Sequence, residues 1–130
     1  MLVEAFSGVW SFDRSASELK SPPVEWRQTI QAGDSRVSVR EEITRESGRS
    51  VVEVSGAFDG EFYRVEGSPL VEEIAYKFNG ESIQGTGRKQ GTVVLSEVVS
   101  LLDPDTLNIA MTIFLNGKEL LLGNAVFRRA

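Results

Sequence analysis

Phe6-Ser7-Gly8-Val9-Trp10-Ser11-Phe12-Asp13 is the stretch of sequence that decides the fold. Successive side chains of a strand point to opposite faces, so the three aromatic residues and Gly8 share one face. A glycine among aromatic residues gives up side-chain packing, which is typical of a bend or of a close approach by another segment. We therefore expect a first strand here, with Trp10 either at the closed end of a barrel or in an ordinary sheet core.

The rest of the chain has the pattern of further strands joined by short turns. Asp59-Gly60, Asn79-Gly80 and Asn116-Gly117 suit the type I′ hairpin turn, whose two central residues need positive φ. Nine more strands are predicted by the alternation of polar and apolar residues between the turns. They cover residues 24–31, about 37–43, 50–58, 62–65, 71–78, 81–89, 92–102, 106–115 and 118–129.

Ten strands in hairpin order predict an all-β fold, an antiparallel up-and-down barrel with one short flap at residues 14–23. Closure of a twisted ten-stranded sheet removes its exposed edges, which favours the barrel. A sandwich of two sheets would bury the same faces, so the alternation alone leaves that fold open.

Composition limits the chemistry. The 130 residues suit a single domain over residues 1–130, and the chain contains neither cysteine nor histidine. Thiolate nucleophiles, imidazole catalysis and Cys- or His-ligated metals are therefore excluded, and we expect no catalytic residues, no metal and no cofactor. The chain has 19 acidic and 14 basic residues, a balance that argues against nucleic acid and anionic membranes as partners.

The compartment is left open by the sequence. No stretch resembles a signal peptide or an apolar segment of about 20 residues that would insert in a membrane. As written, the chain is expected in the cytoplasm, and it would be exported if a leader had been trimmed from it.

Several side chains are candidates for the lining of an internal cavity. Alternation places Trp26 and Gln28 on an inner face, and Glu97 on the more apolar face of its strand. A buried Glu97 would have a raised pKa, whereas a bulge or an exposed edge would leave it in water. The same residue types are equally typical of an ordinary core. The predicted ligand-binding residues are Trp26, Gln28, Tyr63, Tyr76, Glu97 and Met111.

Two further features bear on such a cavity. Glu41 shares the inner face of Val37, Val39 and Ile43 unless a bulge intervenes. Three glycines, Gly56, Gly85 and Gly87, fall at positions that would face inward, where they would leave volume unfilled. A largely apolar wall without an arginine clamp favours a neutral or weakly polar ligand over an anion.

Gly8-x-Trp10 resembles the first-strand motif of lipocalins and fatty-acid-binding proteins. In those proteins the last strand carries an aromatic residue and, two residues on, a basic residue that covers the tryptophan; Phe127 and Arg129 match that spacing. Residues 59–69 resemble the pattern Asp-Gly-x-x-Tyr-x-Val-x-Gly-x-Pro of small bacterial lipocalin-like domains. The resemblance implies a calycin-type barrel closed by Gly8, Trp10 and an arginine of the last strand.

The chain departs from this pattern in three places. The Arg and Tyr that hold the ligand carboxylate in fatty-acid-binding proteins correspond here to Ala125 and Phe127. The helix-turn-helix lid is reduced to the flap. A strict two-residue hairpin would turn Arg128 inward instead of Arg129, and a bulge near Gly123 would restore Arg129.

The sequence thus favours binding of a small, largely apolar or weakly polar molecule. The alternatives are a non-catalytic interaction or structural domain and, less expected, a barrel isomerase or lyase that works without histidine. A homodimer is also expected, because the last strands have apolar residues on both faces. The residues that would otherwise lie in water are Val94, Val98, Phe114 and Leu121, unless the N-terminal segment or the flap covers them.

Overall fold

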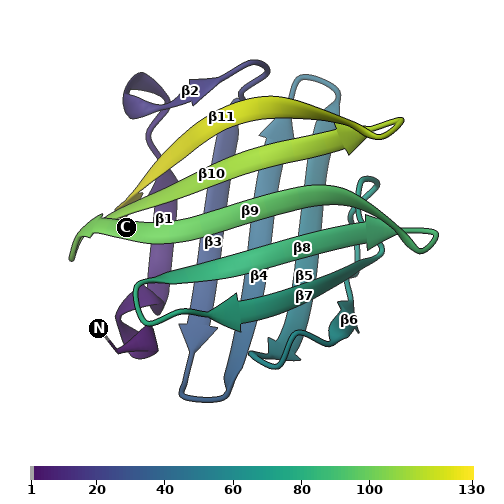
Figure 1. Cartoon of the computed structure of the whole chain (residues 1–130). Coiled ribbons are helices and arrows are strands. Elements are labelled where there is room, and N and C mark those ends of the chain that lie inside the picture. The colour runs from purple at the N-terminus through teal and green to yellow at the C-terminus, as the bar shows by residue number, and fades with distance from the viewer. Residues whose placement is uncertain (1) are drawn as a thin grey trace.

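The computed structural model describes residues 2–130, except for the side chain of Leu121. Eleven strands and two short 3-10 helices make up the fold (Figure 1). In chain order they are η1 (Val3–Phe6), β1 (Gly8–Phe12), η2 (Arg14–Ala16), β2 (Glu18–Leu19), β3 (Glu25–Ala32), β4 (Arg36–Arg45), β5 (Gly48–Ala57), β6 (Phe62–Arg64), β7 (Glu73–Phe78), β8 (Ser82–Lys89), β9 (Thr92–Asp103), β10 (Thr106–Leu115) and β11 (Lys118–Arg129).

Ten strands follow one another around a nearly closed antiparallel barrel, in the order β5-β4-β3-β1-β11-β10-β9-β8-β7-β6. In Figure 1, β1, β3, β4 and β5 form the rear layer, and β7 to β11 run across it in front. The seam between β5 and β6 is bridged by two backbone hydrogen bonds between Glu53 and Glu66, of 3.0 and 2.9 Å. The predicted ten-stranded barrel is confirmed, and the sandwich is excluded.

The barrel is completed by β1, which pairs with β3 on one side and with β11 on the other. The guanidinium of Arg129 lies over the indole of Trp10, 4.3 Å from the ring centroid. Gly8 makes this possible, since a Cβ at that position would collide with the guanidinium, and its φ of +146° disfavours other residues. Arg128 points away from the indole and pairs with Asp13 at 3.1 Å.

A bulge in β11 sets the register that brings Arg129 to this place. Met111 pairs with Gly123 but Thr112 pairs with Leu121, so Leu122 is the extra residue. The shift pairs Leu107 with Phe127 instead of Val126. The bulge therefore lies beside Gly123, the position at which a bulge was predicted to turn Arg129 toward Trp10.

The N-terminal 3-10 helix η1 closes the end of the barrel at which Arg129 covers Trp10. Phe6 is fully buried and makes an edge contact with Phe78, at 6.2 Å between ring centroids. The expectation that Phe6 begins the first strand is wrong, because Phe6 ends η1, where the N–H of Ser7 donates to the Glu4 carbonyl at 3.0 Å. The Phe6 carbonyl accepts a hydrogen bond from the Trp10 indole at 3.0 Å. Arg129 in turn donates to the carbonyls of Ala5 and Ser7, at 2.9 and 2.8 Å.

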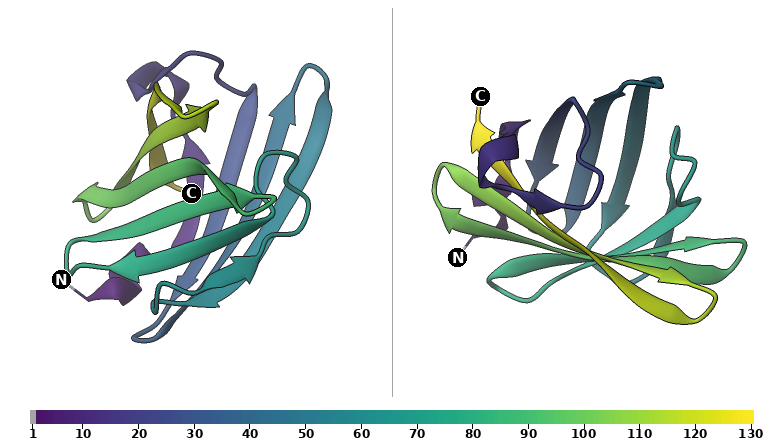
Figure 2. Two further views of the ribbon diagram at one scale, coloured as in Figure 1. Left: turned by 45° about the vertical axis from the view of Figure 1, so that its right-hand side comes forward. Right: turned by 90° about the horizontal axis from the view of Figure 1, so that it is seen from above.

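The opposite end carries the predicted flap, built from η2 and β2 (Figure 2). The side chain of Asp13 caps η2 by accepting from the backbone N–H of Ala16. Two residues of the flap, β2, pair with β11. Arg45 donates to the carbonyl of Ser21 at 3.0 Å, which ties the flap to the β4–β5 hairpin.

Candidate ligand cavity

A cavity of about 580 Å³ lies inside the barrel. This volume falls within the range of roughly 300–1,000 Å³ that small-molecule sites occupy. The wall is mainly aliphatic and comes from the inner faces of both layers. Its apolar members include Ile30, Val37, Val39, Ile43, Val52, Val54, Val65, Ile74, Ile83, Leu95, Val99, Met111 and Ile113.

The mouth of the cavity lies between three segments of the chain. These are the flap at residues 19–23, the β4–β5 hairpin at residues 45–50 and the loop at residues 68–71. Lys20 and Arg45 are exposed at this rim. Because η1 closes the other end, the rim is the natural route by which a molecule would enter.

Glu41 lies on the cavity wall and accepts two hydrogen bonds through one oxygen. Its Oε1 receives the indole N–H of Trp26 at 2.9 Å and the amide of Gln28 at 2.8 Å. The described pairing of β3 with β4 is continuous and places Gln28 directly opposite Glu41. Burial raises the pKa of Glu41, and the two hydrogen bonds oppose that shift.

The predicted lining omits Glu41, although the sequence contains the signal for it. The residue alternates with Val37, Val39 and Ile43, which all face inward, and the bulge that would have turned it outward is absent from the described β3–β4 pairing. Gln28, the cross-strand neighbour of Glu41, supplies a hydrogen-bond donor that lets the acid remain on the inner face.

Glu97 faces Glu41 from the other layer. It belongs to a row of paired residues that crosses four strands, Tyr76 on β7, Gly85 on β8, Glu97 on β9 and Met111 on β10. Burial, together with the nearby charge of Glu41, raises the pKa of Glu97 to about 8. The alternative of a bulge or exposed edge at Glu97 is wrong, since β9 is paired on both sides at this residue.

Gly85 makes room for the side chain of Glu97 and leaves no unfilled volume of its own. A Cβ at Gly85 would lie 2.9 Å from both Cγ and Oε1 of Glu97, so the acid occupies the space above the glycine. Gly56 is covered in the same way by the ring of Tyr63, and Gly87 by the side chain of Val71. The expectation that these glycines subtract filling from the interior is therefore wrong.

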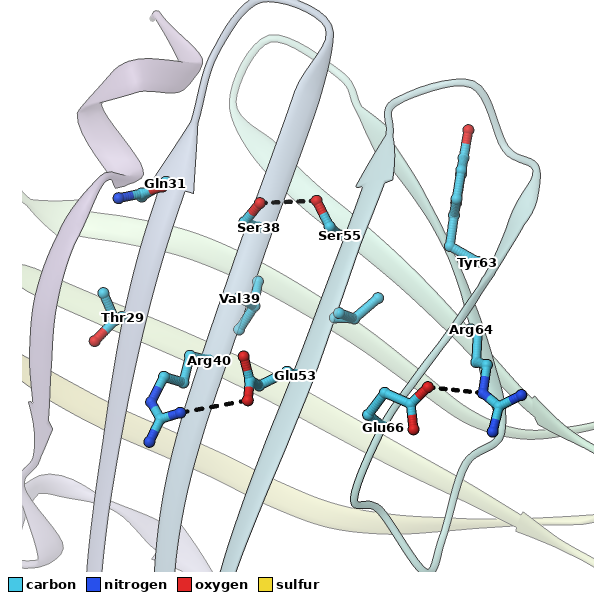
Figure 3. Close-up of a pocket in the computed structure, with 11 residues that line it drawn as sticks. Thr29, Gln31, Ser38, Val39, Arg40, Glu53, Ser55, Tyr63, Arg64 and Glu66 are labelled. Carbon is cyan, nitrogen blue, oxygen red and sulfur yellow. Dashed lines mark hydrogen bonds and ion pairs between the residues drawn. The ribbon is translucent and has the colours of Figure 1, made fainter.

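Tyr63 is the one predicted lining residue that the structure does not bring to the cavity. Its ring lies on Gly56, and its hydroxyl donates to Asp59 Oδ2 at 2.7 Å. That hydrogen bond raises the pKa of Tyr63. Because Gly56 has no side chain and Asp59 offers an acceptor in the turn after β5, the tyrosine lies at the seam between β5 and β6 (Figure 3).

The other five predicted residues all line the cavity. Trp26 and Gln28 stand beside Glu41, and Met111 stands beside Glu97. Tyr76 is buried, and its pKa is raised well above the usual value by burial and by the two carboxylates. The ring of Trp26 packs edge-on against Phe127, with centroids 4.9 Å apart.

A second hollow lies outside the barrel, along β3 to β6 and the seam (Figure 3). Its side chains are mostly charged or hydroxylic. The ion pairs Arg40–Glu53 and Arg64–Glu66, at 3.4 and 2.8 Å, are largely exposed to water. Such exposed pairs are weak. Among the described residues of this hollow, no buried side-chain nitrogen or oxygen lacks a hydrogen-bond partner.

Comparison of the chain with protein-family models, with curated proteins and with solved structures found no match. The nearly closed all-β barrel is compatible with a calycin-like fold. Among residues 2–130, none of the helices has the length and apolar character needed to cross a membrane. The described side chains also contain no group of three or more potential acidic metal ligands.

Proposed function

We propose that this protein binds a small, largely apolar molecule inside the barrel, in the manner of lipocalin-like carriers. The cavity supports the proposal because a barrel core that served only stability would be filled with side chains. A mainly aliphatic wall with a few convergent polar groups is the usual composition of a small-molecule site. The Gly8, Trp10 and Arg129 closure agrees with the lipocalin resemblance.

A titration with an environment-sensitive apolar dye tests this function. We expect saturable binding and a change in the emission of Trp26, the tryptophan on the cavity wall. A Trp10→Phe background isolates that signal. The emission of Trp26 should respond because its indole N–H is held by Glu41 inside the cavity.

A filled-cavity variant provides the control. Ile43 and Ile113 are half-buried and face the cavity from β4 and β10. The double variant Ile43→Trp, Ile113→Trp should weaken dye binding at least about tenfold by occupying the space. Val98→Trp adds a similar ring to the outer face and should leave binding unchanged. Equal binding by the folded filled variant would mean that the dye binds elsewhere and that the function is wrong.

An interaction domain is the second candidate. Several apolar side chains on the outer face of the last strands stay in contact with water, with Val98 38% exposed and Leu102 63% exposed. A homodimer through this face would cover them. This function needs no ligand, so it would replace the first if the cavity binds nothing.

An isomerase or lyase is a third candidate, since Glu97 and Tyr76 converge on one cavity. With a pKa of about 8, Glu97 holds a proton at neutral pH and is suited to general acid catalysis. Loss of turnover with retained binding in Glu97→Gln would identify such an enzyme.

A further inference from the structure

The carboxylate of Glu97 is aimed into the cavity without a partner. The part of its surface that is not covered by protein forms the cavity wall. None of the described backbone or side-chain groups donates a hydrogen bond to it or forms an ion pair with it. Its neighbours in the sheet, Gly85 and Met111, offer no donor side chain. A polar group held in this way is a candidate to receive a ligand.

Glu41 adds a second acceptor on the facing wall. Both of its hydrogen bonds, from Trp26 and Gln28, go to Oε1. No described donor reaches Oε2, so that oxygen remains an acceptor. Two carboxylates thus present three oxygens with open lone pairs to the same space.

Among the residues that the structure describes, no basic side chain lies inside the cavity beside these acids. The ionisable groups on the described wall are Lys20, Glu41, Arg45, Tyr76 and Glu97. Lys20 and Arg45 are exposed at the rim, where Arg45 donates to the Ser21 carbonyl. Protonation offsets the cost of burying Glu97, whose pKa is about 8, and burial also raises the pKa of Glu41.

We propose that the ligand carries a basic amine, and that Glu97 and Glu41 together receive its ammonium group while the aliphatic walls hold its apolar body. This inference rests on the proposed function, because it names the chemical class of the molecule bound in the same cavity. An ammonium group has three N–H donors and one positive charge, which match the three open oxygens and the missing cation. Trp26 and Tyr76 also line this cavity, and aromatic rings attract a cation more than an anion.

Binding of an amine should release a proton from Glu97, so the affinity should depend on pH. Below about pH 8, the incoming R–NH₃⁺ displaces the proton of the Glu97 carboxyl group, and that proton leaves to the solvent. Apparent affinity for an alkylamine should therefore rise up to about tenfold per pH unit and level off above about pH 8. An alkylamine stays protonated over this range, since its pKa is close to the value of about 10.4 for lysine.

Three probes with the same eight-carbon chain test the amine preference: octylamine, 1-octanol and octanoate. Each is titrated into the full chain by calorimetry at neutral pH, with competition against the apolar dye. We expect octylamine to bind at least about tenfold more tightly than octanol, and octanoate to bind most weakly. Titration in phosphate and in Tris, which differ in ionisation enthalpy, should report about one proton released per octylamine bound.

Glu97→Gln is the critical variant, with Glu61→Gln, an exposed loop position, as the matched control. Glu97→Gln should lose the preference for octylamine and the proton release while retaining octanol binding, and Glu61→Gln should change neither. The pH dependence of the octylamine-to-octanol affinity ratio in the unaltered protein needs no variant and gives the same answer if Glu97→Gln does not fold.

The outcomes separate the two proposals. Saturable octanol and dye binding with no preference for octylamine, or a preference that survives in Glu97→Gln, would overturn the amine assignment and leave the binding function standing. Failure of the dye and of all three probes to bind would overturn the binding function itself.

Discussion

Glu97 is a carboxyl group whose proton affinity differs between the folded and the unfolded chain. Its pKa is about 8 when folded, against about 4.3 for an unperturbed glutamate. Between these values the folded chain keeps a proton that the unfolded chain has lost, so stability falls as pH rises. The slope from this group is at most about 1.4 kcal/mol per pH unit.

We therefore expect the unaltered protein to lose stability relative to Glu97→Gln as pH is raised from about 5 to about 8. The two proteins should have the same pH dependence below about pH 4, where Glu97 is protonated in both states. Urea unfolding at several pH values measures this difference. The lowered pKa values of Asp13, Asp59 and Asp103 place their titration below this window. Parallel curves across the window would show that Glu97 is not buried as described.

Arg129 gives a second prediction about a single side chain. It covers the Trp10 indole and donates to the carbonyls of Ala5, Ser7 and Pro104. Arg129→Ala should reduce the free energy of unfolding by about 2–4 kcal/mol and shift the emission of Trp10.

Arg128→Ala is the matched control for this change. Its ion pair with Asp13 is half exposed, and the Thr106 hydroxyl to which it also donates keeps its own hydrogen bond to Asp103. Arg128→Ala should therefore cost less stability than Arg129→Ala and leave Trp10 emission in place. Chemical denaturation followed by tryptophan fluorescence measures both variants. Equal losses in the two would contradict the assigned closure.

Much of the site follows from the period-two alternation, which points Trp26, Gln28 and Glu97 inward without knowledge of the partner strands. Tyr63 has the same inward parity, since it pairs with Ile74, yet it leans onto Gly56 across the seam. That contact joins β5 to β6, and the isolated backbone bridge at this seam pairs Glu53 of β5 with Glu66, two residues after β6 ends. Alternation within a strand carries no information about such a neighbour.

The bulge in β11 makes room for the flap. Gly123 has a φ of +116°, and a Cβ there would collide with the carbonyl oxygen of Glu18 on β2. Gly123→Ala should destabilise the protein by about 1–3 kcal/mol and release β2 from β11. Hydrogen exchange of the Lys20 amide, which bonds the Leu122 carbonyl, measures that release.

Gly33→Ala is the comparison for the bulge glycine. A Cβ at Gly33 meets nothing within 4 Å, and its φ lies outside the left-handed region. This change should leave Lys20 exchange unaltered and stability the same or slightly higher. Similar exchange at Lys20 in the two variants would mean that Gly123 is not what admits the flap.

The strands themselves were largely predictable because their turns have specific chemistry. Asn116-Gly117 has positive φ at both residues, as a type I′ turn requires, and the expected strands at 106–115 and 118–129 match β10 and β11. The predicted type I′ turns at Asp59-Gly60 and Asn79-Gly80 are wrong, because only their glycines have positive φ; the Asp59 and Asn79 side chains instead accept from the backbone N–H two residues on. The 3-10 helix η1 was missed because one of its carbonyls, that of Ala5, is held by Arg129, which lies 124 residues along the chain. The sequence near Phe6 contains no trace of that partner.

The outer surface of the barrel yields a prediction about assembly. Val94 and Phe114 are half-buried and Val98 is exposed on the outer face of β9 and β10, while the side chain of Leu121 lies outside the described residues. Neither η1 nor the flap, which lie at the two ends of the barrel, covers Val98. We expect a homodimer through this face.

Val98→Lys should convert such a dimer to monomers, because an ammonium group cannot be buried there without a partner. Sedimentation equilibrium at micromolar concentration measures the change. Ser55→Lys, on the outer face of β5, should leave the association state as it is. A monomer in all three proteins would contradict the dimer.

The pairing of β1 with β11 also fixes the order of events when the chain is made. Arg129 bonds to Ser7, which a ribosome synthesises 122 residues earlier. Until β11 emerges, the nascent chain is an open sheet whose edges at β1 and β10 are unpaired and whose apolar inner face meets water. The barrel can therefore close only after β11 has been synthesised, and a chain that stops before β11 keeps two unpaired strand edges and an apolar inner face exposed to chaperones and proteases.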